Sequence, residues 1–263
     1  MRGWALGLLL GFALAQGRLE VGLYGAPGQV TPALEAAFSL GEGEVYAKGQ
    51  GGRGALGYLG SLSLGPLGFL AYGVQGELGE GGVGGAVFLE GGAGPVALEG
   101  RLGFRPQAAL PLFPEAAFFG RLALRYRASP KEVWGLEVAQ NAPPRPSSFG
   151  LQPGWEGGFR LEGSYALRQE ATYTLGMGVS PWPYALLGFK GEVGAEGEVL
   201  DLLLRLGGVN RLEAGLYLGE ASLHLTLSHP WAGSLVVWLG DLGLEAGYHK
   251  APYAWVRYAW RWP

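Results

Sequence analysis

Apolar residues occupy alternate positions along almost the whole last quarter of the chain. Between Asp201 and Tyr258 only short turns interrupt the pattern, whose apolar positions are Leu202, Leu204, Leu206, Leu212, Ala214, Leu216, Leu218, Leu223, Leu225, Leu227, Leu235, Val237, Leu239, Leu242, Leu244, Ala246 and Tyr248. Side chains alternate between the two faces of a β-strand, so this repeated period of two predicts an antiparallel sheet with one strongly apolar face. The intervening positions hold Asp201, Arg205, Arg211, Glu213, Ser222, His224, Thr226, Ser234 and Glu245, which gives the other face a polar character.

The first fifteen residues are typical of a secretory signal peptide. Arg2 precedes an apolar core from Trp4 to Leu14, and Ala13-Leu14-Ala15 is a small-residue site that suits a signal peptidase. This core is too short to span a membrane as a helix, and charges or turn residues break every later apolar run before it reaches that length. We therefore predict a signal peptide over residues 1–15 and one domain over residues 16–263.

The composition narrows the functional classes. Gly and Pro number 50 and 17, which approaches the range of disordered chains, but 48% hydrophobic residues provide the apolar surface that such chains lack. The sequence has no cysteine, which excludes disulfides and thiolate metal sites, and its net charge of −3 gives no footprint for nucleic acid. His229 and His249 have no cluster of metal-ligating neighbours, so we predict neither a metal nor a cofactor.

Period-two segments between turn signals predict an all-β fold of eighteen strands, with sixteen as the alternative. The predicted strands are 18–24, 32–40, 43–50, 53–63, 67–77, 82–90, 95–104, 115–127, 131–139, 157–168, 170–179, 183–193, 198–206, 210–218, 221–228, 233–239, 241–249 and 253–262. The two longest gaps, 105–114 and 140–156, both follow odd-numbered strands, whereas the connections after even-numbered strands are predicted to be tight. Long loops on one rim and short turns on the other are typical of up-and-down barrels in bacterial outer membranes.

The same periodicity also fits a soluble sandwich or a lipocalin-like barrel, so other features must separate the two classes. Sixteen to eighteen strands is the range of barrels with an aqueous channel. Aromatic residues near predicted strand ends, Trp182, Tyr184, Trp231, Tyr248 and Tyr253, fit girdles at lipid headgroups. We therefore predict a single closed antiparallel transmembrane β-barrel, whose first and last strands pair with each other.

The C-terminal segment carries the most specific signal. Ala254, Val256, Tyr258, Trp260 and Trp262 alternate up to the end of the chain. This segment resembles the last strand of bacterial outer-membrane β-barrels, with Pro263 after the final aromatic and Trp where Phe is usual. The resemblance implies a porin-like barrel of a diderm bacterium, in which Tyr258, Trp260 and Trp262 form a signal for the outer-membrane assembly machinery. Outer-membrane lipid would be the second partner, and homo-oligomerisation is left open.

A barrel with lipid outside assigns the charged residues to its interior. The predicted lumen-facing residues are Glu77, Glu90, Glu99, Arg101, Arg121, Arg125, Arg127, Arg160, Glu162, Arg168, Asp201, Arg205, Arg211 and Glu213. The predicted lipid-facing residues are Leu122, Leu124, Tyr126, Leu202, Leu204, Leu206, Leu223, Leu225 and Leu227. Acids dominate the early strands and arginines the middle ones, so two arrangements stay open: opposed acidic and basic walls, or a network of ion pairs.

Three functions follow from this fold. The first is a channel for small hydrophilic solutes without catalysis, and the second is a plugged structural or envelope-assembly barrel. The third is a barrel-embedded lipid hydrolase, because Ser222 and His224 share a face and Asp201, Glu213 or Glu245 would orient the imidazole. The Cα atoms of residues i and i+2 on a strand lie about 7 Å apart, which is long for a direct Ser–His hydrogen bond. We therefore predict a protein that is not an enzyme.

Overall fold

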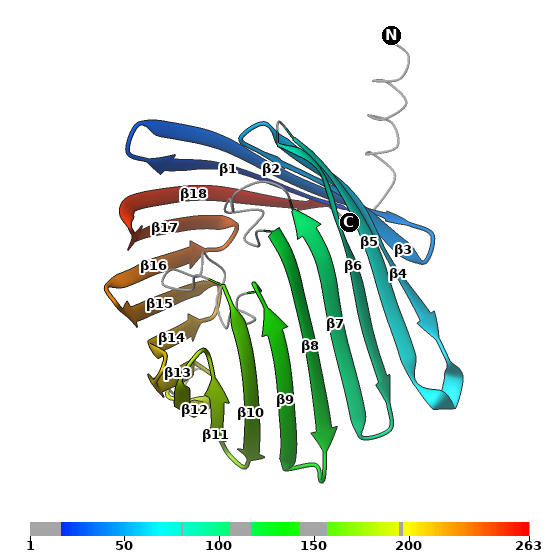
Figure 1. Cartoon of the computed structure of the whole chain (residues 1–263), viewed down its shortest axis with the longest axis vertical. Helices are drawn as coiled ribbons and strands as arrows, with labels where there is room; N and C mark the ends of the chain where they lie inside the picture. The colour runs from blue at the N-terminus through cyan, green and yellow to red at the C-terminus, as the bar shows by residue number, and fades with distance from the viewer. Residues whose placement is uncertain (1–16, 80, 106–116, 143–156, 195–196, 263) are drawn as a thin grey trace.

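Eighteen β-strands form almost all of the computed structural model, which describes residues 17–79, 81–105, 117–142, 157–194 and 197–262 (Figure 1). The strands are β1 Gly17–Ala26, β2 Gln29–Leu40, β3 Gly43–Gln50, β4 Arg53–Ser63, β5 Phe69–Gly79, β6 Gly82–Ala93, β7 Val96–Arg105, β8 Ala117–Arg127, β9 Glu132–Gln140, β10 Phe159–Arg168, β11 Thr172–Val179, β12 Pro183–Glu192, β13 Val199–Gly207, β14 Asn210–Leu218, β15 Ala221–His229, β16 Ala232–Leu239, β17 Leu242–His249 and β18 Ala251–Trp262. A 3₁₀ turn at Gly65–Leu67 is the one helical element among these residues.

Every strand pairs antiparallel with its neighbours in sequence, and β1 also pairs with β18 along its length. Gly17 lies opposite Trp262 at one end of this seam, and Gly25 lies opposite Ala254 at the other. The seam tolerates no side chain at Gly22, because a Cβ there would lie 2.7 Å from Nε1 of Trp255 and 2.9 Å from the carbonyl oxygen of Val256. The sheet is therefore a closed barrel without edges, which confirms the predicted fold and strand count.

The predicted strand positions agree with the observed ones to within a few residues, but the prediction for the connections was partly wrong. The turns after even-numbered strands are not all tight, since residues 64–68 join β4 to β5 and residues 193–198 join β12 to β13. The rim that carries these turns also carries the start of β1 at Gly17 and the end of β18 at Trp262, and we call it the terminal rim. The other rim, the distal rim, carries the connections after odd-numbered strands. The predicted signal peptide lies outside the described residues.

Contacts between strands that are not neighbours identify the inner face. Arg205 on β13 contacts Glu162 on β10, and Arg105 on β7 contacts Glu77 on β5. Side chains of separated strands converge only on the concave side of a closed sheet, so these residues and their i±2 neighbours point inward. The register carries this assignment around the whole barrel, and it places Leu122 outward with 52% of its surface exposed.

The outward positions hold almost no polar side chains. Across the eighteen described strands, the charged, amide and imidazole side chains in the outward set are Glu132, Gln140, Asn210 and His229. Each of these four is the first or last residue of its strand. Because the outward polar residues lie only at strand ends, the outer surface between the rims is a continuous apolar band. None of the described helical segments has the length and hydropathy of a membrane-spanning helix.

Outward aromatic side chains border this band near both rims. Those within three residues of the terminal rim are Phe38, Tyr72, Tyr126, Trp134, Tyr165, Tyr173, Phe189, Trp260 and Trp262, and those near the distal rim are Phe104, Phe118, Phe159 and Tyr248. Neighbouring rings are in contact at the terminal rim, with centroids 4.8 Å apart for Trp134 and Tyr165. The predicted girdle was wrong for Tyr184 and Tyr253, which are buried on the inner face.

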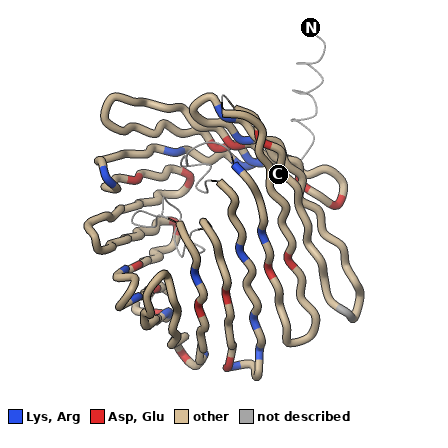
Figure 2. The backbone as a smooth tube through the Cα atoms, viewed as in Figure 1, with Lys and Arg blue, Asp and Glu red and all other residues tan. Residues whose placement is uncertain are grey.

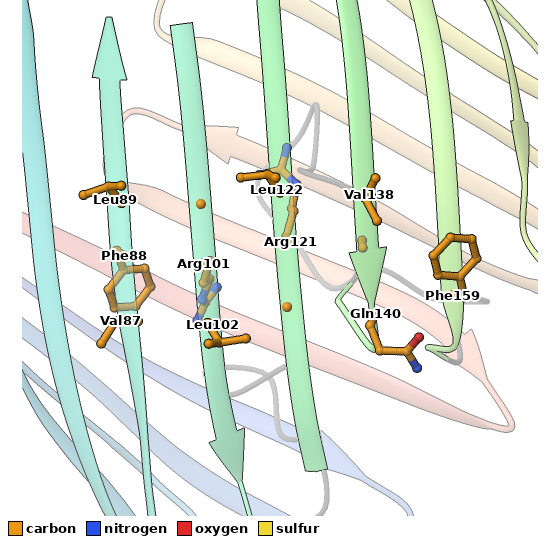
Figure 3. Close-up of a pocket in the computed structure, with 13 residues that line it drawn as sticks. Val87, Phe88, Leu89, Arg101, Leu102, Arg121, Leu122, Val138, Gln140 and Phe159 are labelled. Atoms are coloured by element: carbon orange, nitrogen blue, oxygen red, sulfur yellow. The ribbon is translucent and has the colours of Figure 1, made fainter.

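Glycines leave a shallow groove of about 630 Å³ in the outward surface of β6 to β10 (Figure 3). Gly100 and Gly120 lie in outward positions, where a leucine of the neighbouring strand leans over each missing side chain. The groove walls are apolar and include Leu102, Leu122 and Phe159. The outward surface of this part of the barrel is therefore uneven as well as apolar.

Candidate functional site

The inner face divides into a closely packed distal half and a more open terminal half. Inward side chains in the distal half are almost fully buried, among them Arg105, Phe119, Arg160, Arg205 and Arg211. Inward side chains near the terminal rim are exposed instead, including Arg18, Glu90, Arg125, Arg127, Arg168, Lys190 and Arg261. Solvent therefore reaches the charges of the terminal half more freely.

A row of alternating charges crosses the middle of β7 to β10. Arg121 on β8 donates to Glu99 on β7 and to Glu137 on β9, each at 2.7 Å. Arg160 on β10 donates to the same Glu137 and to the carbonyl oxygen of Ala142. Arginines and glutamates alternate from strand to strand in this part of the wall (Figure 2). Each carboxylate that bonds Arg121 comes from the strand next to it, so no charge in the row has to be buried alone.

A second cluster joins β10 to β14 through Glu162 and Glu213. Arg205 bridges both carboxylates at 3.0 Å, and Arg211 donates to Glu213 at 2.8 Å. The Tyr184 hydroxyl donates to Glu162 at 2.8 Å, which explains why this tyrosine faces inward. Glu213 has only 2% of its surface exposed, so its bonds to two guanidinium groups compensate a fully desolvated charge.

Two further clusters occupy the remaining parts of the wall. On β3 to β7, Arg105 pairs with Glu77, which also accepts from Gln75, and Tyr46 donates to Gln75 at 2.8 Å. The Arg105 guanidinium also lies 5.1 Å from the ring centroid of Phe119.

At the seam, Arg257 lies between Trp238 and Trp255, at 4.9 and 4.1 Å from their ring centroids. Glu20 and Glu245 each approach this arginine to 3.7 Å, and Tyr253 donates to Glu245. The guanidinium is therefore held by aromatic rings as well as by carboxylates.

All fourteen residues that we predicted for the lumen lie on inward positions of the register, and the buried ones among them, such as Glu77, Arg160 and Glu213, form ion pairs within the wall. Four acids of the early strands have basic partners: Glu77 pairs with Arg105, Glu20 approaches Arg257, and Arg18 lies 3.2 and 3.8 Å from Glu35 and Glu44. Of the two arrangements left open, opposed walls or a network of ion pairs, these contacts favour the network for the paired charges, because interstrand pairing within the wall satisfies them.

Sequence reasoning missed the inward aromatic residues. Tyr46, Tyr184, Tyr253 and Trp255 all bury their rings on the inner face. For β18 the signal was present, since Tyr253, Trp255 and Arg257 alternate with the outward Ala254, Val256 and Tyr258. The alternation itself thus placed Tyr253 and Trp255 beside an arginine.

Ser222 and His224 form a direct hydrogen bond, although their Cα separation on a strand predicted a distance too long for one. Ser222 Oγ lies 3.0 Å from Nε2 of His224, whose imidazole is 1% exposed and packs edge-on against Tyr217. The ring leans over Gly215, where a Cβ would lie 3.1 Å from Nδ1. The side chains thus bridge the roughly 7 Å Cα separation by tilting toward each other. No group of three or more described His, Asp or Glu residues is placed to hold a metal ion.

A lumenal cavity of about 320 Å³ opens beside this pair at the terminal rim. Its lining combines charges of both signs with aromatic rings, and it includes Ser222, Trp238, Arg257 and Arg261. The cavity has a more polar lining than the outward groove on β6 to β10 because it lies on the inner face. The inner face therefore offers bound solutes charged groups and hydrogen-bonding groups near the terminal rim.

No protein-family model and no curated protein sequence matches this chain. The fold is similar to solved structures of mutants of Rhodopseudomonas blastica porin. A triple mutant and a double mutant are each 9% identical to this chain, with a TM-score of 0.50, and each comparison covers 94% of this chain and 99% of the porin. A third structure, described as showing asymmetric conductivity of engineered proteins, is 10% identical with the same TM-score and coverage. These similarities show that the chain has a porin-like β-barrel fold.

Proposed function

We propose that this protein is a porin-like channel for small hydrophilic solutes in a bacterial outer membrane. The observation that carries the proposal is the sorting of side chains between the two faces of a closed sheet. The outward set has no charged residue within the strands apart from the terminal Glu132, and the inward set holds the arginines and glutamates. A soluble barrel requires the reverse, because its interior is the apolar core. Lipid is the solvent that suits the observed outer surface.

Three further features support this proposal. Eighteen strands enclose a cross-section wide enough for water, since barrels of sixteen to eighteen strands leave an aqueous channel. The aromatic residues at both rims match the girdles of membrane barrels at lipid headgroups. Export through a signal peptide at residues 1–15, and insertion by an assembly machinery that binds Tyr258, Trp260 and Trp262, complete the proposal. Two of these aromatics, Tyr258 and Trp260, are exposed on the outward face of β18.

Current through a planar bilayer tests the channel. We expect refolded protein to insert and give stable, stepwise ion currents, because hydrated charges line the terminal half of the lumen. Folding is checked separately by a shift in gel mobility between heated and unheated samples. Folded, inserted protein that carries no current would contradict the channel.

The same measurement distinguishes the second candidate, a plugged structural barrel. The observation that favours it is the near-complete burial of inward side chains in the distal half, such as Phe119 and Arg160. A plugged barrel would insert and remain silent under voltage. Current steps that grow in proportion to the voltage, and so give one constant conductance, would exclude the plugged barrel.

A hydrolase is the third candidate, and the Ser222–His224 hydrogen bond favours it. Acyl transfer also needs donors for the oxyanion, but the strand amides around Ser222 lie in the ladders with β14 and β16. We therefore expect the folded protein to react with a fluorophosphonate probe no faster than its Ser222→Ala variant, as measured by mass spectrometry. Selective labelling of Ser222 that required His224 would establish a reactive serine instead.

A further inference from the structure

The wall formed by β7 to β10 carries more positive than negative charge on its inner face. Its inward positions hold seven arginines and three glutamates: Arg101, Arg105, Arg121, Arg125, Arg127, Arg160 and Arg168 against Glu99, Glu137 and Glu162. All three carboxylates form ion pairs with buried arginines. Glu99 and Glu137 pair with Arg121, Glu137 also pairs with Arg160, and Glu162 pairs with Arg205 on β13. The positive excess must therefore lie on the remaining arginines.

The register of β7 to β9 explains why Arg125 carries part of this positive excess. Ala123 on β8 lies opposite Glu99 on one side and Glu137 on the other. Arg121 and Arg125 each stand two residues from Ala123, so both are diagonal neighbours of the same two carboxylates. Both carboxylates bond Arg121 at 2.7 Å, and Arg125 has no ion pair within 4 Å among the described residues. Its directly opposed residues are Ala97 and Gly135, which offer no charge.

Arg127 and Arg168 extend this uncompensated charge toward the terminal rim. Arg127 faces Val133, and Val133 faces Ala166 on β10, two residues before Arg168. The Arg168 amide donates to the carbonyl oxygen of Lys131, which brings a fourth cationic residue to the same edge. Like Arg125, neither arginine has an ion-pair partner in the described chain, and both side chains are exposed.

Two carboxylates lie near these arginines without pairing with them. Glu132 points outward, where its oxygens accept from Tyr165 at 3.0 Å and from Ser129 at 3.1 Å. Glu170 lies in the turn after Arg168, and none of the residues that the structure describes forms an ion pair with it within 4 Å. Arg125, Arg127, Lys131 and Arg168, which we call the arginine edge, therefore retain an excess of positive charge.

We propose that the arginine edge is a binding site for small oxyanions, with phosphate and phosphorylated solutes as its preferred ligands. Guanidinium groups bind phosphate through paired N–H donors, and several on one wall provide more donors than a single cation does. The edge lies where inward side chains are accessible to water, so a soluble ligand reaches it without displacing buried pairs. The route to the site rests on the proposed channel, whereas binding itself requires only the folded barrel.

Binding of radiolabelled inorganic phosphate to the refolded barrel, measured by equilibrium dialysis at fixed ionic strength, tests the site directly. We expect saturable binding that weakens by roughly tenfold or more in the triple variant Arg125→Gln, Arg127→Gln, Arg168→Gln. The matched control is Arg18→Gln, which removes an exposed inward arginine that already has carboxylate partners. This control should bind phosphate as the unmodified protein does.

Planar-bilayer currents provide a second readout that separates the two proposals. We expect a reversal potential that favours anions in a salt gradient and a current that phosphate reduces, with both effects lost in the triple variant. Anion-indifferent currents, or phosphate binding equal in the triple variant, would overturn the site and leave the channel intact. Absence of current together with phosphate binding that the triple variant loses would overturn the channel and support the site. Gel mobility confirms that each variant is folded.

Discussion

Replacing Glu213 by glutamine is expected to lower the free energy of unfolding by about 3–5 kcal/mol, the range for breaking a buried ion pair. Glu213 accepts from Arg205 and Arg211, whose side chains are 4% and 0% exposed. The amide is similar in size but carries no charge, so two guanidinium groups would remain in the packed wall with one carboxylate, Glu162. Urea-induced unfolding in lipid vesicles, followed by tryptophan fluorescence, measures the loss.

A more exposed ion pair on the inner face of the same barrel provides the control for Glu213. Lys190 and Asp201 lie 3.2 Å apart, but the lysine side chain is 56% exposed. Lys190→Gln should therefore change stability by only about 0–1 kcal/mol. Adding Arg211→Met to Glu213→Gln should recover part of the loss, because it removes one of the stranded charges. Equal effects of Glu213→Gln and Lys190→Gln would show that the Glu162–Arg205–Glu213–Arg211 cluster is hydrated.

The second large effect is expected from a charge on the outer surface. Leu204 lies at the middle of β13 and faces outward between Leu187 and Leu212. Leu204→Arg should destabilise the folded barrel in lipid by about 2–4 kcal/mol, the cost of a lysine or arginine at the bilayer midplane. The same vesicle unfolding assay measures it, and the loss should shrink in a detergent micelle, which deforms more easily around a charge.

The neighbouring residue makes a matched control because it differs only in the face that it occupies. Leu203 faces inward, and its directly opposed residues are Gly188 and Glu213. An arginine at this position reaches polar surroundings, so Leu203→Arg should cost less than about 1 kcal/mol. If the inward substitution were the more damaging one in lipid, the assignment of the two faces would be reversed.

The strand pattern was predictable because each strand encodes its own alternation and its own turns. Positions such as Leu202, Leu204 and Leu206 differ from Asp201 and Arg205 regardless of how the strands are arranged in space. The largest error in a strand start was three residues, at β2. The start of β5 was wrong by two residues, and there the 3₁₀ turn at Gly65–Leu67 follows a leucine that continues the apolar pattern. Local chemistry therefore determined the number of strands, their order and their faces.

The choice of partners within the wall was not predictable in the same way. Arg205 contacts Glu162, which is 43 residues away and three strands distant, so the pair depends on the curvature of the closed sheet. Alternation assigns both to the inner face but gives no distance between them. Likewise, the Ser222–His224 hydrogen bond depends on side-chain tilt over Gly215, which a Cα spacing does not contain.

The pairing of Gly17 with Trp262 sets the order in which this barrel can assemble. Every other pairing joins two strands that are consecutive in the sequence, whereas this one joins residues about 245 positions apart. The loss of chain entropy on closing a loop of that length costs roughly 5 kcal/mol. A chain in transit therefore remains an open ribbon whose two free margins, β1 and β18, are templates for aggregation. Both margins stay unprotected until β1 pairs with β18, so the docking of the last strand on the first is the step that completes the ring.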